Sequence, residues 1–270
     1  MSINFDRAAE YYDATRGYPP EIAAAIGAAL VAAAGATATS RFLEIGVGTG
    51  RIALPVIALG YHYTGVDISA QMMDRLRQKV EDLERETGKT PQAVLLQADM
   101  QALPFAAHSF DAVIAAHVFH LVADPVKALQ EALRVLTPPG PLLICGDATT
   151  GQEPISVNET WRTIVREVYG PIPNSSESID YILKDILAHD PAVQVLESRP
   201  VRWDYATTVA AELDGVRKRL WSNTWVLPDA VFEQCLDRLT TWCTNTYGSQ
   251  MDHPLPRTGE FVIRKVWRST

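Results

Sequence analysis

The sequence predicts an α/β fold in which helices cover both faces of a mostly parallel β-sheet. Through the first half of the chain, short apolar runs alternate with segments whose apolar residues recur at helical spacing. The run Leu142–Cys145 is apolar without interruption, which is typical of a parallel strand buried on both faces. The chain has 270 residues, 47% of them apolar and 21% charged, an ordinary globular balance with enough length for one large α/β domain.

The elements of the first half follow from these runs and from the residues that border them. Ser69 is suited to cap one helix, and Asp124 followed by Pro125 is suited to begin another. Gly35 and Gly88 are placed to end helices. We expect strands at 41–45, 61–66, 93–96, 110–115 and 142–145, and helices at 22–35, 69–88 and 124–136.

The second half is less regular and holds all six tryptophans. Ile179 to Leu187 carries an apolar stripe at helical spacing. We expect further elements as a strand within 193–205, helices near 208–220 and 229–246, and a last strand at 260–267. Aromatic residues gathered outside the first half suggest a cap that faces a substrate, although ordinary core packing is as good an explanation for any one of them.

Charge and composition exclude several classes of function. With 24 Lys and Arg against 32 Asp and Glu, the net charge is −8, which argues against binding to a nucleic-acid backbone. No apolar run is long enough to span a bilayer. Three cysteines without a C-x-x-C pair suggest reduced thiols in the cytoplasm, and the six histidines form no H-E-x-x-H pattern, so no metal is expected.

A glycine-rich loop, Gly46-Val47-Gly48-Thr49-Gly50, directly follows the first expected strand. Glycines let the backbone turn sharply and approach a ligand closely. Dinucleotide-binding folds use G-x-G-x-x-G at this place, whereas the spacing here is G-x-G-x-G and Arg51 stands where the third glycine would be. Taken alone, the loop is also compatible with a tight strand–helix turn that binds nothing.

Two acidic residues follow later strands. Asp67 ends the second strand about twenty residues past the loop, where a carboxylate can accept from both ribose hydroxyls in dehydrogenases and methyltransferases alike. A role as helix cap is the alternative, but Ser69 suits that role better. Asp99 closes the third strand, and the segments Leu103-Pro104-Phe105 and Ser109–Val113 follow it.

Four motifs in order, E-I-G-V-G-T-G, V-D-I-S, A-D-M-Q-A-L-P-F and S-F-D-A-V-I-A-A-H, resemble the class I S-adenosylmethionine (SAM)-dependent methyltransferases. The resemblance is to the small-molecule branch with the ubiquinone and menaquinone enzymes, and it runs from about Asn4 to Ala148. It implies a Rossmann-like sheet of seven strands, mostly parallel, with the last strand antiparallel. It also implies SAM as cofactor and S-adenosylhomocysteine as product.

The resemblance implies roles for individual residues. Asp67 holds the ribose, Asp99 accepts from the adenine amino group, and Met100 packs on the ring, which suits the chemistry of these side chains. The full set implied to contact SAM is Glu44, Gly46, Val47, Gly48, Thr49, Gly50, Asp67, Ile68, Met72, Asp99, Met100, Ala115 and His117, with Tyr12 and Arg16 from a lid.

Candidates for the side of the methyl acceptor are less specific. His117 and His120 lie just past the fourth strand, and one of them is a candidate base or orienting group, although no partner acid is identifiable and both are equally explained by hydrogen bonds to their loop. Asp147 is an acid at the end of the fifth strand that either faces the pocket or caps the next loop. Further candidates are Tyr11 and Tyr18 in a lid, with a solvated arm as the alternative, and Trp161, Trp221 and Trp225 as pocket walls, with core packing as the default.

We therefore expect one methyltransferase domain over 1–270. Its core is expected at about 36–150, 176–205 and 259–268, and its cap and lid at 1–35, 154–174 and 206–256. The predicted reaction moves a methyl group from SAM to a small-molecule nucleophile by in-line displacement. The alternatives are a SAM-binding protein without turnover and an NAD-dependent oxidoreductase, which Arg51 and Asp99 oppose. The stretch Ala115–Val118 lacks the [D/N]-P-P-[Y/F] motif of nucleic-acid amino methyltransferases, and a cytoplasmic monomer or homodimer is expected.

Overall fold

The computed structural model describes residues 2–150, 156–171, 181, 183, 185 and 192–268. The chain divides into two compact units. The sheet unit comprises Met1–Ala148, Asn174–Arg202 and Glu260–Thr270, and the helical unit comprises Thr149–Pro173 and Trp203–Gly259. The expected division into a core and a cap stays a prediction.

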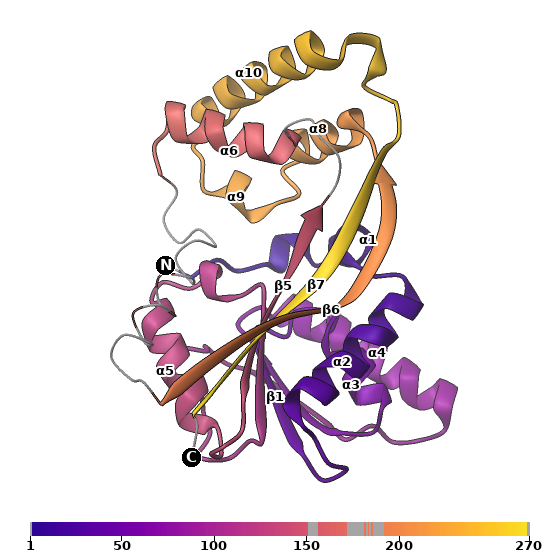
Figure 1. Ribbon diagram of the computed structural model, residues 1–270, viewed down its shortest axis with the longest axis vertical. Helices are drawn as coiled ribbons and strands as arrows, with labels where there is room; N and C mark the ends of the chain where they lie inside the picture. Colours follow the sequence, from indigo (N-terminus) through magenta and orange to yellow (C-terminus); the bar gives the residue numbers. More distant parts are fainter. Residues whose placement is uncertain are drawn as a thin grey trace. The chain divides into compact units, whose positions relative to one another are not determined.

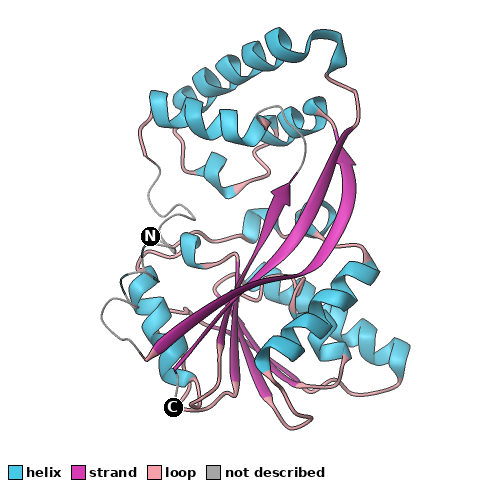
Figure 2. Ribbon diagram, viewed as in Figure 1, coloured by secondary structure: helices cyan, strands magenta, loops and turns pink. Residues whose placement is uncertain are grey.

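A seven-stranded sheet with the order β3-β2-β1-β4-β5-β7-β6 forms the framework (Figures 1 and 2). Six strands are parallel and the last along the chain, β7, is antiparallel, which confirms the expected fold class. The strands are β1 (Arg41–Ile45), β2 (His62–Asp67), β3 (Ala93–Gln97), β4 (Ala112–Ala116), β5 (Leu142–Thr150), β6 (Val193–Thr207) and β7 (Leu255–Arg268).

The register of the parallel strands gathers their carboxyl ends at one edge. Ile45 of β1 lies between Val66 of β2 and Ala115 of β4. Ala116 of β4 pairs with Cys145 of β5. Loops that leave these strands therefore begin close together, which is where ligands bind in such sheets.

Helices cover both faces of the sheet unit, with α2, α3 and α4 on one side and α5 on the other (Figure 1). Two expected caps are present: Ser69 accepts from the N–H of Met72, and Asp124 accepts from the N–H of Lys127. The helical segments are η1 (Asp6–Ala8), α1 (Tyr12–Arg16), α2 (Pro20–Ala34), α3 (Ala53–Ala58), α4 (Ala70–Thr87), η2 (Phe119–Leu121) and α5 (Pro125–Val135).

Two strands are longer than the apolar runs that predicted them. β5 continues from Cys145 to Thr150, and β7 begins at Leu255 rather than at residue 260. Backbone pairing does not require apolar side chains, so hydropathy alone misses these polar extensions. Of the stripe expected from Ile179 to Leu187, most lies outside the described residues, but Leu183 is buried in the core of the sheet unit.

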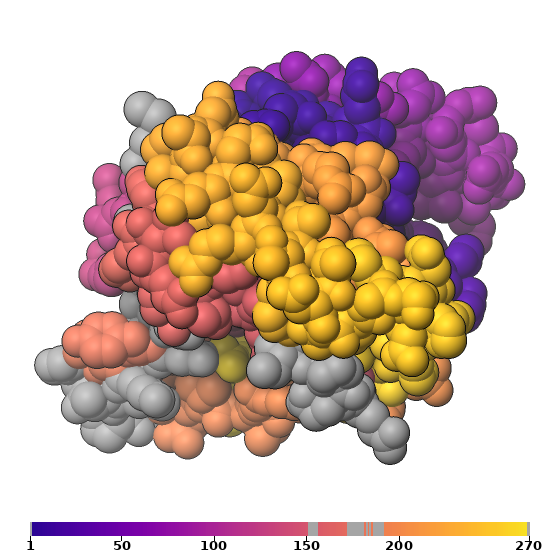
Figure 3. Space-filling view, turned by 90° about the horizontal axis from the view of Figure 1, so that it is seen from above, coloured from indigo at the N-terminus to yellow at the C-terminus, as the bar shows by residue number. Residues whose placement is uncertain are grey.

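The helical unit has its own apolar core. Trp161 is fully buried and meets the Phe232 ring edge to face at 5.7 Å. Helix α10 packs on both α6 and α8, and its gold surface lies beside the salmon surface of α6 in Figure 3. Its segments are α6 (Val157–Val168), α8 (Val209–Arg217), α9 (Ser222–Trp225), α10 (Asp229–Tyr247) and η3 (Gly248–Gln250).

None of the helices formed by the described residues is both long enough and apolar enough to cross a membrane. Within the same residues, no cluster of three His, Cys, Asp or Glu side chains is placed to hold a metal ion.

Candidate active site

The glycine loop adopts backbone conformations that residues with a side chain rarely adopt. Gly46, Gly48 and Gly50 have φ of 72°, 54° and 84°, in the left-handed region that favours glycine. A Cβ on Gly46 would lie 2.3 Å from Val118 Cγ2, whereas a Cβ on Gly48 would meet nothing within 4 Å. The loop is therefore closed against the protein at Gly46 and leaves space at Gly48.

Asp67, at the carboxyl end of β2, is fixed by two backbone donors. Its Oδ2 accepts from the N–H of Gly48 at 2.9 Å, and its Oδ1 accepts from the N–H of Ser69 at 2.8 Å. Burial raises the pKa of Asp67, and these N–H groups counteract that rise. Each carboxylate oxygen has a second lone pair, which can accept from a neighbouring hydroxyl of a ligand.

Glu44, the acid before the loop, has its carboxyl group turned inward. It is 2% exposed and accepts a hydrogen bond from the Tyr63 hydroxyl at 2.7 Å. Burial raises the pKa of Glu44 to about 8, although the Tyr63 hydroxyl favours the ionised form. At neutral pH this carboxyl group is mostly protonated and acts within the core of the sheet unit.

The other residues expected around adenine lie on the β2 and β3 side of the edge. Asp99 is exposed, and its carboxylate accepts from the backbone and the side-chain amide of Gln101. Met72 and Met100 are buried, and Ile68 is half-buried. Of these side chains, only Asp99 and Ile68 are accessible at the surface, whereas Met72 and Met100 are covered by the protein.

The segment before α2 crosses this edge through polar contacts. Asp6 accepts from the Ser69 hydroxyl at 2.5 Å. Asp13 accepts from the Thr49 hydroxyl at 2.6 Å and pairs with Lys79 of α4 at 2.6 Å. Ser69 and Lys79 of the α4 region and Thr49 of the glycine loop anchor the segment, so it is held to the loop and to α4 rather than extending into solvent.

A cluster of four side chains joins this segment to the ends of β4 and β5. Tyr18 donates to Asp147 Oδ1 at 2.6 Å, and Arg51 Nη1 lies 3.4 Å from Asp147 Oδ2. His117 Nε2 lies 3.2 Å from the same Oδ2. The Arg51 guanidinium also sits 4.6 Å above the Tyr18 ring and donates to the carbonyl of Arg16 at 2.9 Å.

Electrostatics fix the charge states of Asp147 and Tyr18 within this cluster. Burial alone would raise the pKa of Asp147, but His117, Arg51 and Tyr18 together hold that pKa at about 2. Burial, together with the neighbouring Asp147, raises the pKa of the Tyr18 hydroxyl, which therefore remains a donor. Burial lowers the pKa of Arg16, and Arg51 adds to that effect. Among the described residues, Arg16 Nε is buried without a hydrogen-bond partner.

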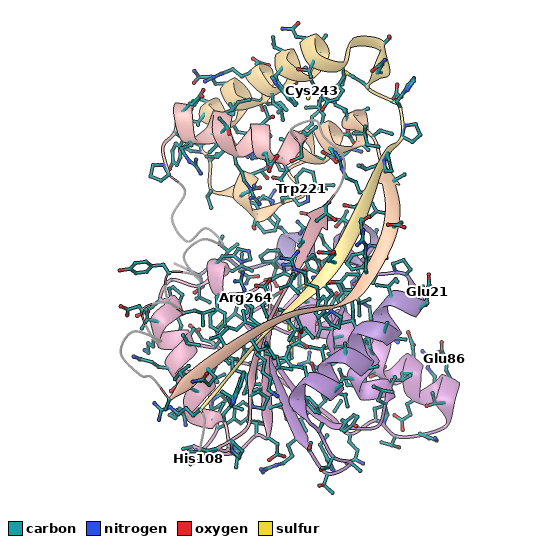
Figure 4. All side chains as sticks on the ribbon, viewed as in Figure 1. Glu21, Glu86, His108, Trp221, Cys243 and Arg264 are labelled. Atoms are coloured by element: carbon teal, nitrogen blue, oxygen red, sulfur yellow. The ribbon has the colours of Figure 1, made fainter. Side chains whose placement is uncertain are left out.

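A cavity of about 270 Å³ lies beside the cluster. His117 and Asp147 line it together with other residues of the segments that end β4 and β5. Strands β6 and β7, which follow β5 in the sheet order, form another part of the wall and contribute Glu197, Arg199 and Arg264 (Arg264 is labelled in Figure 4). Residues of the sheet unit alone form this lining.

The β6–β7 wall is a charged network. Glu197 accepts from Arg264 Nε at 2.9 Å and from Arg199 Nη2 at 3.2 Å, and these contacts lower the pKa of Glu197. Arg199 also donates to Glu260 at 2.8 Å. Such a wall favours polar ligands, since an apolar ligand would strip water from the charged groups without replacing its hydrogen bonds.

The residues at the β1 and β2 ends fit SAM. The open side of Gly48 lets a ligand approach the backbone closely, and the fixed Asp67 carboxylate is an acceptor for vicinal hydroxyls. The guanidinium groups of Arg16 and Arg51 carry two positive charges, and Asp147 places one negative charge near both. The carboxylate of a ligand would balance the remaining positive charge.

Comparisons with known proteins agree with this geometry. Residues 43–144 match the family described as "Methyltransferase domain". A phosphatidylethanolamine N-methyltransferase of Cereibacter sphaeroides is 30% identical over 161 residues, which cover 60% of this chain and 73% of that enzyme. The demethylmenaquinone methyltransferase of Clavibacter sepedonicus is 34% identical over 112 residues, which cover 42% of this chain and 43% of that protein.

The chain belongs to the class I SAM-dependent methyltransferases. Its fold is similar to that of phosphoethanolamine N-methyltransferase 2 from Haemonchus contortus, whose structure contains phosphomonomethylethanolamine and S-adenosylhomocysteine. That similarity has a TM-score of 0.55 at 17% identity and covers 98% of this chain and 58% of that chain. SAM is the methyl donor of this methyltransferase, and the expected class of small-molecule enzyme is confirmed.

The structure brings some of the expected site residues of the methyltransferase together and not others. Ala115, His117 and His120 all line the cavity, and Tyr18 reaches its edge through Asp147. The three tryptophans are engaged inside the helical unit: Trp161 against Phe232, Trp221 (labelled in Figure 4) over Gly215, and Trp225 as donor to the carbonyl of Arg219. Their role as pocket walls stays a prediction.

Sequence reasoning did not find the partner acid of His117. The position of Asp147 at the end of a strand was a usable signal, since β4 and β5 are neighbours in folds of this kind. Glu197, Arg199 and Arg264 gave no such signal, because alternating charges on a strand are equally typical of a solvated face.

Proposed function

We propose that this methyltransferase methylates a small polar acceptor bound in the cavity between the ends of β4 and β5 and the β6–β7 wall. The observation that carries this proposal is the cavity itself, which both the His117–Asp147 pair and the Glu197–Arg199–Arg264 network line. Val118 lines the cavity and also contacts the glycine loop at Gly46, so the cavity adjoins the proposed SAM site.

The residues proposed to hold SAM divide by the part of the molecule that they bind. Asp67 accepts from the ribose hydroxyls, and Asp99 with Met100 and Ile68 binds adenine. The glycine loop and Arg16 bind the methionine portion, with the unpartnered Nε of Arg16 as a donor for its carboxylate. When bound, SAM supplies a methyl group activated by the positive sulfonium.

The protein contributes orientation on the acceptor side. Holding two reactants in the reactive geometry is worth roughly 7–11 kcal/mol in well-oriented systems. The charged β6–β7 wall fits an acceptor with its own polar or ionic group, and it fits a purely apolar one poorly. The names of the relatives state amine and quinol acceptors for those proteins; for this chain, the cavity supports a polar small molecule without naming it.

Location and assembly complete the proposal. We place the enzyme in the cytoplasm as a monomer or homodimer, on the basis of its three sparse cysteines and its composition. A nucleic-acid acceptor is disfavoured by the net charge of −8. Size-exclusion chromatography with light scattering measures the oligomeric state.

A turnover screen tests the proposed function. The enzyme is incubated with deuteromethyl-SAM and a library of phenols, amines, carboxylates and quinols, and mass spectrometry detects methylated products. Arg264→Met is expected to raise the KM of an accepted acceptor about tenfold and to leave S-adenosylhomocysteine binding unchanged by calorimetry. Arg77→Met, an exposed arginine paired with Asp74 on α4, is the matched control and should change neither quantity.

Two results would overturn the proposal. Tight SAM binding with no methylated product from any acceptor favours the SAM-binding protein without turnover. A product whose KM is indifferent to substitutions in the cavity places the acceptor elsewhere.

A further inference from the structure

We infer that His117, oriented by Asp147, is the general base of this methyltransferase and that its acceptor is a weakly acidic hydroxyl compound of the phenol type. The inference rests on the proposed function, because it assigns the chemistry of the same cavity. It adds the acceptor class and the partner acid that makes a histidine base effective.

The backbone holds His117 in one place. Its φ is 53°, in the left-handed region that residues other than glycine rarely adopt, and its N–H donates to the carbonyl of Cys145 on β5 at 3.1 Å. Strained backbone of this kind persists where the surroundings fix it, and it concentrates at functional sites. This backbone conformation places the imidazole at the end of β4, where it lines the cavity.

Asp147 selects which imidazole nitrogen is the base. Nε2 is buried and lies 3.2 Å from Asp147 Oδ2, in a charge contact whose direction is not that of a hydrogen bond. The negative charge of the carboxylate favours the proton of the neutral ring on Nε2, which leaves the lone pair on Nδ1. Tyr18 and Arg51 hold the carboxylate from two other directions, so it is itself immobile. This arrangement of base and orienting acid follows the logic of catalytic triads, with the roles of the two nitrogens exchanged.

Charge favours a hydroxyl acceptor over an ammonium. The two carboxylates that line the described cavity, Asp147 and Glu197, are each already paired with arginine. A protonated amine would therefore enter beside Arg199, Arg264 and a sulfonium, and the lining residues offer no free carboxylate to compensate its charge. A neutral hydroxyl escapes this penalty, and the same cations stabilise the oxyanion that it becomes.

The proton and electron balance of the step is simple. The acceptor O–H bond breaks and its proton moves to His117 Nδ1. The electron pair left on oxygen forms the new bond to the methyl carbon, and the pair of the broken carbon–sulfur bond stays on sulfur, which becomes neutral. His117 then releases the proton to solvent. A weakly acidic hydroxyl suits a general base because its proton must be removed before or during the attack of oxygen on the methyl carbon.

A series of phenols of graded acidity tests the inference. His117→Gln is expected to lower kcat for weakly acidic phenols by 100-fold or more, the range of general bases, and to change turnover of 4-nitrophenol, assayed at a pH where it is already ionised, by less than fivefold. Binding of S-adenosylhomocysteine by calorimetry should stay within threefold of the parent. His62→Gln, an exposed histidine at the start of β2, is the control that should leave every value unchanged.

A readout independent of turnover uses ¹⁵N NMR of the histidine rings. In the parent, the neutral His117 ring should carry its proton on Nε2, and Asp147→Asn should shift it toward Nδ1. The pH dependence of kcat also reflects the other ionisable groups around His117. These groups are His120, Tyr18, Arg16, Arg51, Asp147, Glu197, Arg199 and Arg264. Loss of the acid limb on weakly acidic phenols in His117→Gln supports the base.

Several outcomes overturn the inference while leaving the proposed function intact. One is an equal loss on ionised and un-ionised phenols, which makes His117 a positioning residue only. Another is loss of the acid limb in His120→Gln instead of His117→Gln. A third is turnover of amines or carboxylates with none of any phenol. If no acceptor is methylated at all, the proposed function itself fails.

Discussion

The two sides of the catalytic edge are built on different principles. On the β1 and β2 side, the site is made of backbone: glycines with positive φ and two N–H groups that fix Asp67. On the β4 and β5 side, it is made of side chains that come from six separate stretches of the chain and meet at Asp147 and the cavity. A site made of backbone requires particular residues at fixed spacing, whereas a site made of side chains does not. The β1 and β2 side, where SAM is proposed to bind, can therefore be recognised in the sequence. The β4 and β5 side, where the acceptor is proposed to bind, can be recognised only in the structure.

The largest expected effect tests the backbone side. Gly46→Ala should destabilise the protein by about 2–5 kcal/mol, since it combines a left-handed alanine with a Cβ pressed against Val118. Gly48→Ala shares the positive φ but meets nothing within 4 Å, so it should cost about 1–2 kcal/mol. Urea unfolding of both variants measures the difference. Equal costs would show that the loop is not packed against Val118.

The next largest effect is expected for Asp67→Ala, which tests whether cofactor affinity and acceptor KM depend on different residues. Charge-assisted hydrogen bonds are worth about 1.5–3 kcal/mol each, so affinity for S-adenosylhomocysteine should fall by roughly 10- to 100-fold in calorimetry. The exposed Asp74→Ala on α4 is the control. KM for the acceptor at saturating SAM should stay the same. A change in acceptor KM without a change in cofactor affinity would reverse the assignment of the two sides.

Glu44 gives a stability difference that depends on pH. Its pKa of about 8 lies above its ordinary 4.5, so the folded state keeps a proton that the unfolded state has lost between those values. Stability should therefore fall with rising pH in that window, by at most about 1.4 kcal/mol per unit, and level off above pH 8. Glu44→Gln should lack this component in urea unfolding at several pH values, while Glu86→Gln, exposed and labelled in Figure 4, should keep it. Parallel curves for the parent and Glu44→Gln would contradict the prediction.

The reach of sequence reasoning follows the same division. The order of the strands, the caps Ser69 and Asp124 and the glycine loop were predictable from the sequence, whereas helices α1 and α6 were not expected. His117 was found as a candidate from the sequence. Its contact with Asp147, 30 residues further along the chain, arises because β4 and β5 are neighbours in the sheet. The tryptophans show another limit, since core packing was the default expectation and Trp161 and Trp221 do pack in the helical unit, while a role as pocket walls stays a prediction.

Tyr18 tests on which side of the edge the first segment of the chain acts, and it carries the smallest expected effect. Tyr18→Phe keeps the ring that meets Phe261 edge to face and lies under Arg51, and it removes only the hydroxyl that donates to Asp147. Because His117 and Arg51 still hold the carboxylate, the loss should be about 0.5–1.5 kcal/mol, which corresponds to a two- to tenfold lower kcat on weakly acidic phenols. Affinity for S-adenosylhomocysteine should not change, since this hydroxyl is directed at Asp147, and Tyr61→Phe beside Phe42 is the control. If Tyr18→Phe instead weakens binding of S-adenosylhomocysteine and leaves kcat intact, the first segment acts on the β1 and β2 side, where SAM is proposed to bind. Asp147 would then belong to that side as well.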